Sequence, residues 1–84
     1  MVYEVLLKRS AERELSGLPR PIHDRIVERL TRLAAAPRAS GAVKLQGRDA
    51  YRIRVGDYRV LYVVDDARRR IEVVAVGHRR DVYR

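Results

Sequence analysis

The chain has 84 residues, of which 46% are hydrophobic and 36% are charged, and this balance predicts one folded domain spanning residues 1–84. It has no cysteine, which excludes a disulfide framework, a cysteine nucleophile and a thiolate metal site. The formal net charge of +8 predicts a polyanionic partner, most simply a nucleic acid. Only Lys8 and Lys44 of the basic residues are lysines, and arginine is the better bidentate ligand for phosphate.

The N-terminal half predicts a strand and two helices. Residues 2–8 read as a strand, and the chain becomes charged too early for a signal peptide and has no apolar run of membrane-spanning length. We therefore expect a soluble cytoplasmic protein with no membrane partner. Ser10 is the predicted N-cap of a first helix that ends at Gly17-Leu18-Pro19. A second helix is predicted from Arg20-Pro21 to just before Pro37.

The C-terminal half predicts a loop and a three-stranded meander. Residues 37–49 carry turn residues around a short apolar anchor at 43–45. Strands are predicted at 50–55, 58–65 and 70–77, with Gly56-Asp57 as a two-residue turn. The order is βααβββ, which indicates an α+β domain with a helical hairpin on one face of a mostly antiparallel four-stranded sheet.

The two-residue turn fixes the register of the central hairpin. The expected facing pairs are Val55 with Tyr58, Arg54 with Arg59, Ile53 with Val60, Arg52 with Leu61, and Tyr51 with Tyr62. Side chains alternate between the faces of a strand, so one face carries the apolar and tyrosine residues that cover the helices. The other face carries Arg52, Arg54 and Arg59, followed by Leu61 and Val63.

This arginine-bearing face predicts an anion-binding site. Two arginines directly opposite each other repel, at a cost of a few tenths to about 1 kcal/mol, which a bound phosphate between them would offset. A solvated outer face without a ligand is the alternative. Past the last strand, His78 has an imidazole, a group suited to proton transfer, and Tyr83 has a ring for stacking on a base. The two histidines are far apart and lack a carboxylate cluster, so no metal or other cofactor is expected.

The chain resembles the RelE/ParE superfamily of toxins of type II toxin–antitoxin systems, and more narrowly its RelE branch. The resemblance rests on an LP break between the two helices, on the segments KLQGRD and YRIRVGDYRVLY, and on the terminal VGHRRDVY. It implies a RelE-like fold and a metal-independent, ribosome-dependent endoribonuclease that cleaves mRNA. The implied partners are the ribosome, mRNA and a cognate antitoxin, which we expect to be acidic and to cover basic surface or Leu61 and Val63.

The resemblance also implies roles for individual residues. The implied catalytic residues are Arg54, Arg59, His78, Arg79 and Tyr83. The expected RNA-binding residues are Lys44, Arg48, Arg52 and Arg80. Two alternatives remain open: a ParE-like inhibitor of DNA gyrase without nuclease activity, and a catalytically weak RNA-binding homologue, since arginine stands at positions 52 and 54 where relatives often have lysine.

Overall fold

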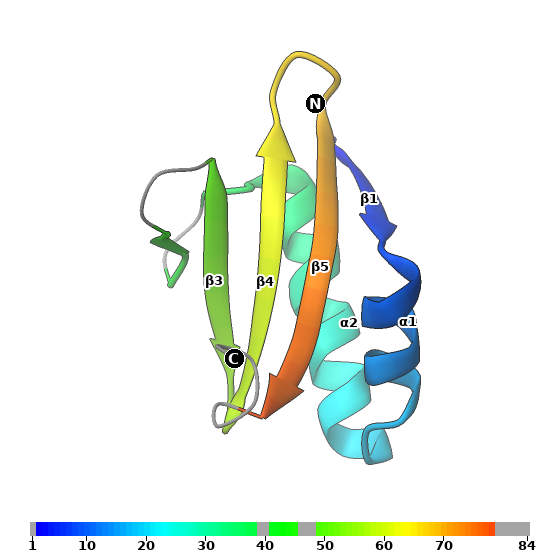
Figure 1. The fold of residues 1–84 in the computed structure, drawn as a ribbon. Helices are drawn as coiled ribbons and strands as arrows, with labels where there is room; N and C mark the ends of the chain where they lie inside the picture. The colour runs from blue at the N-terminus through cyan, green and yellow to red at the C-terminus, as the bar shows by residue number, and fades with distance from the viewer. Residues whose placement is uncertain (1, 39–40, 46–48, 79–84) are drawn as a thin grey trace.

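Two helices lie on the same side of one sheet of five strands (Figure 1). The computed structural model describes residues 2–38, 41–45 and 49–78. In chain order the elements are β1 (Glu4–Leu7), α1 (Arg9–Ser16), α2 (Arg20–Ala35), β2 (Val43–Lys44), β3 (Ala50–Val55), β4 (Tyr58–Asp65) and β5 (Arg70–His78). The strand order across the sheet is β1-β5-β4-β3-β2. The predicted α+β class is confirmed, and the six predicted elements occur in the predicted order. No helix in these ranges is long and apolar enough to cross a membrane.

Two details of the prediction are wrong. The sequence predicts four strands, whereas the structure has a fifth, β2, inside the segment predicted as a loop. A strand of two residues offers no alternation to read, and it forms only because it pairs with Arg52 and Tyr51 of β3. Ser10 is also not an N-cap, because α1 begins at Arg9 with Lys8 before it and without a side-chain cap.

The core lies between the helices and the inner face of the sheet. The central hairpin has the predicted register at all five pairs, and the predicted inner face is buried except for Tyr58, which is half-buried. The core residues from the sheet and the helices include Ile53, Val60, Tyr62, Ile71, Val73, Ile26, Leu30 and Ala11. Alternation along the strands therefore leaves the outer face, away from the helices, for the arginines.

A β-bulge in β5 changes which side chains face the helices. Leu61 pairs with Ala75 and Tyr62 pairs with Val73, so Val74 is the extra residue. Before the bulge the odd-numbered residues of β5 face the core, and after it Val76 does. Past the end of the parallel β1–β5 pairing, the backbone N–H of Val76 donates instead to Oε1 of Glu14 on α1, at 3.0 Å.

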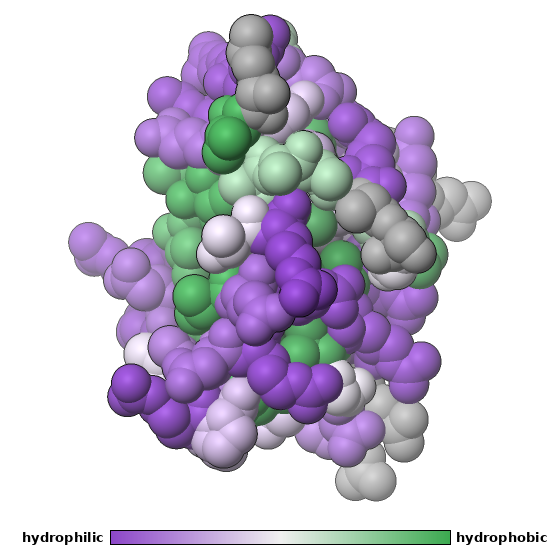
Figure 2. Space-filling model, turned by 180° about the vertical axis from the view of Figure 1, so that it is seen from behind, coloured by the Kyte–Doolittle hydropathy of each residue, from purple (hydrophilic) through white to green (hydrophobic). Residues whose placement is uncertain are grey.

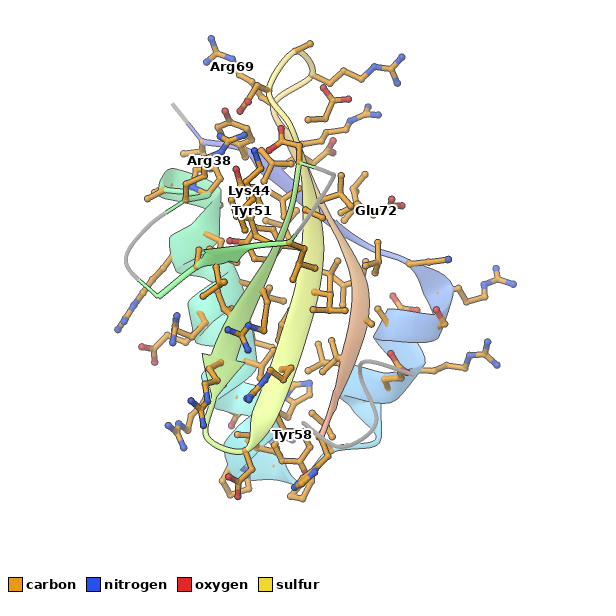
Figure 3. All side chains as sticks on the ribbon, turned by 60° about the vertical axis from the view of Figure 1, so that its left-hand side comes forward. Arg38, Lys44, Tyr51, Tyr58, Arg69 and Glu72 are labelled. Carbon is orange, nitrogen blue, oxygen red and sulfur yellow. The ribbon has the colours of Figure 1, made fainter. Side chains whose placement is uncertain are left out.

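A hydrogen-bond network around Arg38 joins the segment after α2 to the end of the sheet opposite the Gly56 turn. The Arg38 guanidinium donates to Tyr51 Oη at 2.6 Å, to both carboxylate oxygens of Asp49 at 3.0 Å, and to both of Asp66 at 2.8 and 3.1 Å. The hydroxyl of Tyr3 donates to Asp66 Oδ1 at 2.6 Å. Figure 3 shows Arg38 beside Tyr51 at this end. The Arg38 hydrogen bonds are the main reason that the pKa of Asp66 is lowered.

Arg38→Gln tests this network through the pH dependence of stability. The pKa of Asp66 in the folded chain lies below its ordinary value of 3.8, so its carboxylate stabilises the fold above that pH and ceases to do so as pH falls through the lowered pKa. We expect the free energy of unfolding to decrease on acidification from about pH 5 to pH 2, and to decrease less in Arg38→Gln. Urea denaturation over this range measures both slopes. Arg32→Gln, which removes an exposed helical ion pair with Glu28, is the matched control, and an unchanged slope in Arg38→Gln would contradict the assignment.

Candidate nucleic-acid interface

Three arginines from two adjacent strands share the outer face of the sheet. Arg54 of β3 pairs with Arg59 of β4, and Arg52 lies two residues before Arg54 and pairs with Leu61. We call Arg52, Arg54 and Arg59 the arginine cluster. Arg54 is exposed, Arg52 is half-buried, and Arg59 has only 9% of its surface exposed. The predicted juxtaposition of Arg54 and Arg59 is therefore confirmed.

Arg59 is a buried cation with unused hydrogen-bond donors. Within the described part of the chain, its Nε and Nη1 atoms are buried without a hydrogen-bond partner, and no carboxylate forms an ion pair with it. Its neighbour on β5 is Gly77, which places no side chain beside it. A buried donor without an acceptor costs about 1–3 kcal/mol, and more when the group is charged. The arrangement is complementary to an anion that would accept from these N–H groups.

The turn at Gly56 explains why the two arginines meet. Gly56 has φ +61°, whereas Asp57 does not have a positive φ, as in a type II′ turn with glycine at its first central position. This turn suits the twist of the flanking strands and allows a loop of only two residues. Arg54 and Arg59 therefore face each other one pair away from the turn.

His78 does not lie on the arginine-bearing face. It pairs with Tyr58, and the ring centroids of the two residues are 5.6 Å apart in an edge-to-face contact. Tyr58 belongs to the inner face of β4, so the bulge at Val74 has turned the His78 ring toward the helix side. The end of β5 still reaches the cluster, because Gly77, the residue before His78, pairs with Arg59.

The other predicted site residues are either distant or not described. Lys44 of β2 pairs with Tyr51, and Figure 3 shows it near Arg38, at the opposite end of β3 from the Gly56 turn and Tyr58. The structure therefore does not bring Lys44 next to Arg59. Four predicted residues lie outside the described residues: Arg48, Arg79, Arg80 and Tyr83. In the described ranges, no group of three or more His, Asp or Glu side chains is placed to hold a metal ion.

Apolar surface occurs on both sides of the sheet. On the outer face, Leu61 and Val63 are half-buried, while Leu6 and Val43 are 41% and 45% exposed. Seen from the helix side, Figure 2 shows a hydrophobic strip bordered by hydrophilic side chains. A groove of about 370 Å³ lies between β1, α1 and α2 and is lined by Tyr3, Val5, Leu7, Leu15, Val27, Leu30, Thr31 and Ala34. Our sequence reasoning missed this groove, although the alternation of apolar residues at 3, 5 and 7 was a signal for it.

Comparison with known proteins gives a consistent set of similarities. The family model described as the ParE toxin of the type II toxin–antitoxin system parDE matches residues 5–83. Toxin RelG of Mycobacterium tuberculosis is 33% identical over 86 residues, covering 100% of this chain and 99% of that protein. Toxin RelE of the same organism is 31% identical over 84 residues, covering 98% and 87%.

Solved structures agree with these sequence matches. A mutant of the Escherichia coli toxin RelE in the free state superposes with a TM-score of 0.82 at 27% identity, covering 93% of this chain and 84% of that one. RelE in the archaeal RelE–RelB complex of Pyrococcus horikoshii also gives a TM-score of 0.82 at 27% identity, covering 98% and 100%. The likeness in fold therefore extends over nearly the whole chain.

Arg59→Met tests whether the buried guanidinium is kept for a ligand. Methionine has a similar length and no donors, so we expect the free energy of unfolding to rise by about 1 kcal/mol. The wild type should gain thermal stability from inorganic phosphate relative to chloride at equal ionic strength, because an anion that binds the folded state stabilises it, and the variant should lose this gain. Arg54→Met, at the exposed partner position, should change stability by less than about 0.5 kcal/mol. A destabilised Arg59→Met that still responds to phosphate would show that Arg59 is structural.

Proposed function

This chain belongs to the RelE/ParE superfamily of toxins of type II toxin–antitoxin systems, and we propose from that premise that it is a ribosome-dependent endoribonuclease that cleaves mRNA and inhibits translation in the cytoplasm. The observation that carries the proposal is Arg59, a buried guanidinium directly opposite Arg54, two of whose donor atoms have no partner among the described residues. Such a pair suits a phosphodiester better than a neutral ligand.

The proposed cleavage requires a group that takes the proton of the ribose 2′-hydroxyl, donors that stabilise the charge at phosphorus, and a group that protonates the 5′-oxygen. The ribose 2′-oxygen loses its proton and forms a bond to phosphorus, the bond from phosphorus to the 5′-oxygen breaks, and that oxygen gains a proton. The products are a 2′,3′-cyclic phosphate and a 5′-hydroxyl. The pentacoordinate intermediate carries extra negative charge, and fixed donors aimed at that charge lower the barrier by several kcal/mol.

We assign charge stabilisation to Arg59 and Arg54. Arg59 is held by the sheet with its Nε and Nη1 atoms already removed from water, so little reorganisation is needed when charge develops on the phosphate. Arg52 and Arg79 would bind flanking phosphates, and Tyr83 would orient the attacking nucleotide. The ribosome would present the mRNA in a reactive geometry, which contributes by proximity.

Proton transfer requires a different group, because arginine remains protonated in proteins. We assign it to His78, which follows Gly77, the residue paired with Arg59. The His78 ring packs against Tyr58 on the other face, so this assignment requires the end of β5 to rearrange when RNA binds.

Arg59→Ala tests the proposed chemistry. We expect cleavage on translating ribosomes to fall by about a hundredfold to a thousandfold, and toxicity on induction to be lost, because a preorganised donor has been removed. Mapping RNA ends should show new 5′-hydroxyl ends in the coding region with the wild type and not with the variant. Arg68→Ala, in the exposed β4–β5 turn, is the control that should retain cleavage. Full cleavage by folded Arg59→Ala would contradict the assignment.

Inhibition of DNA gyrase is a second candidate function. It is favoured by the family model, whose description is that of the ParE toxin. The two functions differ in what stops first after induction: protein synthesis with cut transcripts, or DNA replication with double-strand breaks. Ribosomes that bind the wild type without new RNA ends would instead indicate a catalytically weak RNA-binding homologue.

A cognate antitoxin is the proposed protein partner. Several similar structures are toxin–antitoxin complexes, among them RelBE2 of M. tuberculosis and the RelE–RelB complex of P. horikoshii. We propose that an acidic antitoxin covers the outer face at Leu61 and Val63, because these apolar side chains adjoin the arginine cluster and remain partly exposed. Such a segment would block access of RNA to Arg59.

The double substitution Leu61→Gln/Val63→Thr tests this antitoxin surface. Both changes keep the approximate side-chain size and remove apolar contact, so we expect antitoxin affinity to fall at least about tenfold while the toxin remains folded. Titration calorimetry with the co-encoded antitoxin measures the change. Val2→Thr, at a residue before β1 that is 70% exposed, is the control that should leave affinity unchanged. Unchanged affinity of the double variant would place the antitoxin elsewhere.

A further inference from the structure

A second basic surface lies on α2, beside the edge of β3. Arg25, Arg29 and Arg32 recur at helical spacing on the flank of α2 next to its buried stripe, and Arg29 is itself half-buried. Together with Glu28 and with Val55 of β3, they line a recess of about 240 Å³. Helical spacing alone places these arginines off the stripe formed by Ile22, Ile26, Leu30 and Leu33, but it does not indicate that they adjoin β3.

Two contacts connect this surface to the arginine cluster. Nη1 of Arg29 donates to the backbone carbonyl oxygen of Arg54, at 3.2 Å. Nη1 of Arg25 lies 3.8 Å from the point that a Cβ of Gly56 would occupy, so Arg25 reaches the β3–β4 turn. β2 pairs only with Tyr51 and Arg52, and in the described residues no strand covers the edge of β3 beyond them. The α2 arginines and the arginine cluster therefore lie on two sides of one open strand edge.

Arg25 and Arg29 carry uncompensated charge. Arg32 is neutralised by Glu28, whose Oε1 is 2.6 Å from its Nη2. In the described ranges, neither Arg25 nor Arg29 has a carboxylate within 4.0 Å. Like charges four residues apart destabilise a helix, and a bound anion between Arg25 and Arg29 would offset this cost.

The composition of the recess favours a phosphate chain over a protein partner. Its lining is charged except for Val55, whereas the core of a protein interface is depleted of charge and rich in apolar and aromatic side chains. The groove between β1 and α2 has that apolar character, and the recess does not. Guanidinium groups at an open surface suit the oxygens of a phosphodiester backbone.

We infer that Arg25 and Arg29 form a second phosphate-binding site, and that an RNA strand held by the arginine cluster continues across the edge of β3 onto α2. This inference rests on the proposed function insofar as the chain binds RNA. Arg25 and Arg29 are positioning residues: they hold nucleotides that flank the reacting phosphate and take no part in bond breaking.

The test compares two matched double variants in the full chain. Arg25→Gln/Arg29→Gln and Arg9→Gln/Arg13→Gln each remove two positive charges four residues apart from a helix. Arg9, Arg13 and Arg25 are exposed and Arg29 is half-buried. α1 lies over the β1–β5 edge of the sheet, away from β3 (Figure 1). The probe is a labelled single-stranded 2′-O-methyl RNA of about twelve nucleotides, which binds but cannot be cleaved through its 2′-oxygen. Fluorescence anisotropy over a range of salt concentrations gives the slope of log K against log salt.

We expect the α2 variant to reduce the magnitude of this slope by about 1.4, since each contact with a single-stranded phosphate contributes about 0.7. Arg25→Lys/Arg29→Lys should keep most of the slope. Affinity for an RNA of about four nucleotides, which occupies the cluster alone, should change no more than in the α1 variant. On translating ribosomes, the α2 variant should raise KM and leave kcat unchanged.

Three results would overturn the inference. The first is an equal change of slope in the α2 and α1 variants. The second is an α2 variant that binds RNA normally but no longer binds the antitoxin, which would show that the recess binds a protein. The third is a wild type that does not bind the RNA at any of the salt concentrations, and this result would also overturn the proposed nuclease. If only the nuclease proposal fails, the wild type will bind RNA in a way that depends on Arg25 and Arg29 but will not cleave mRNA on ribosomes.

Discussion

Backbone hydrogen bonds pair β3 with β4 across a turn of two residues, and this register decides which side chains cover the helices and which form the outer face. A slip of one residue would exchange the faces, placing Arg54 in the core and Ile53 in solvent. The turn prevents the slip because Gly56 adopts the positive φ that a two-residue connection requires. The hydrophobic core enforces the same register, so the arginine positions and the stability of the fold depend on one set of hydrogen bonds.

Arginines at the two ends of the sheet have opposite environments. Arg38 donates to two carboxylates and a phenol through all three of its guanidinium nitrogens, and these bonds fasten the segment after α2 to the sheet. Arg59, near the Gly56 turn, is buried and leaves two donor atoms unpaired in the described part of the chain. The first arrangement is typical of a structural arginine, and the second of a binding site that sacrifices some stability for its ligand.

The two faces of the molecule differ in how charged and apolar side chains are arranged. The helix side combines a hydrophilic α2 surface with an apolar groove, and the outer face combines the arginine cluster with the partly exposed Leu61 and Val63. With a net charge of +8, the free chain repels itself and any basic partner, and an acidic antitoxin would relieve both effects while excluding RNA. Under the proposed function, one surface would serve both catalysis and its inhibition, because the same cations would recognise the RNA and the antitoxin.

The sequence by itself determined the order of six of the seven elements, the bounds of β3 and β4, the hairpin register and the opposition of Arg54 and Arg59. These follow from short-range rules: alternation has period two, and a two-residue turn permits one register. Only the tertiary structure decided that Arg59 is buried, that a bulge at Val74 turns His78 away from it, and that Arg29 reaches Arg54 across the strand edge. Burial, bulges and contacts between elements depend on residues far apart in the chain, and no local pattern encodes them.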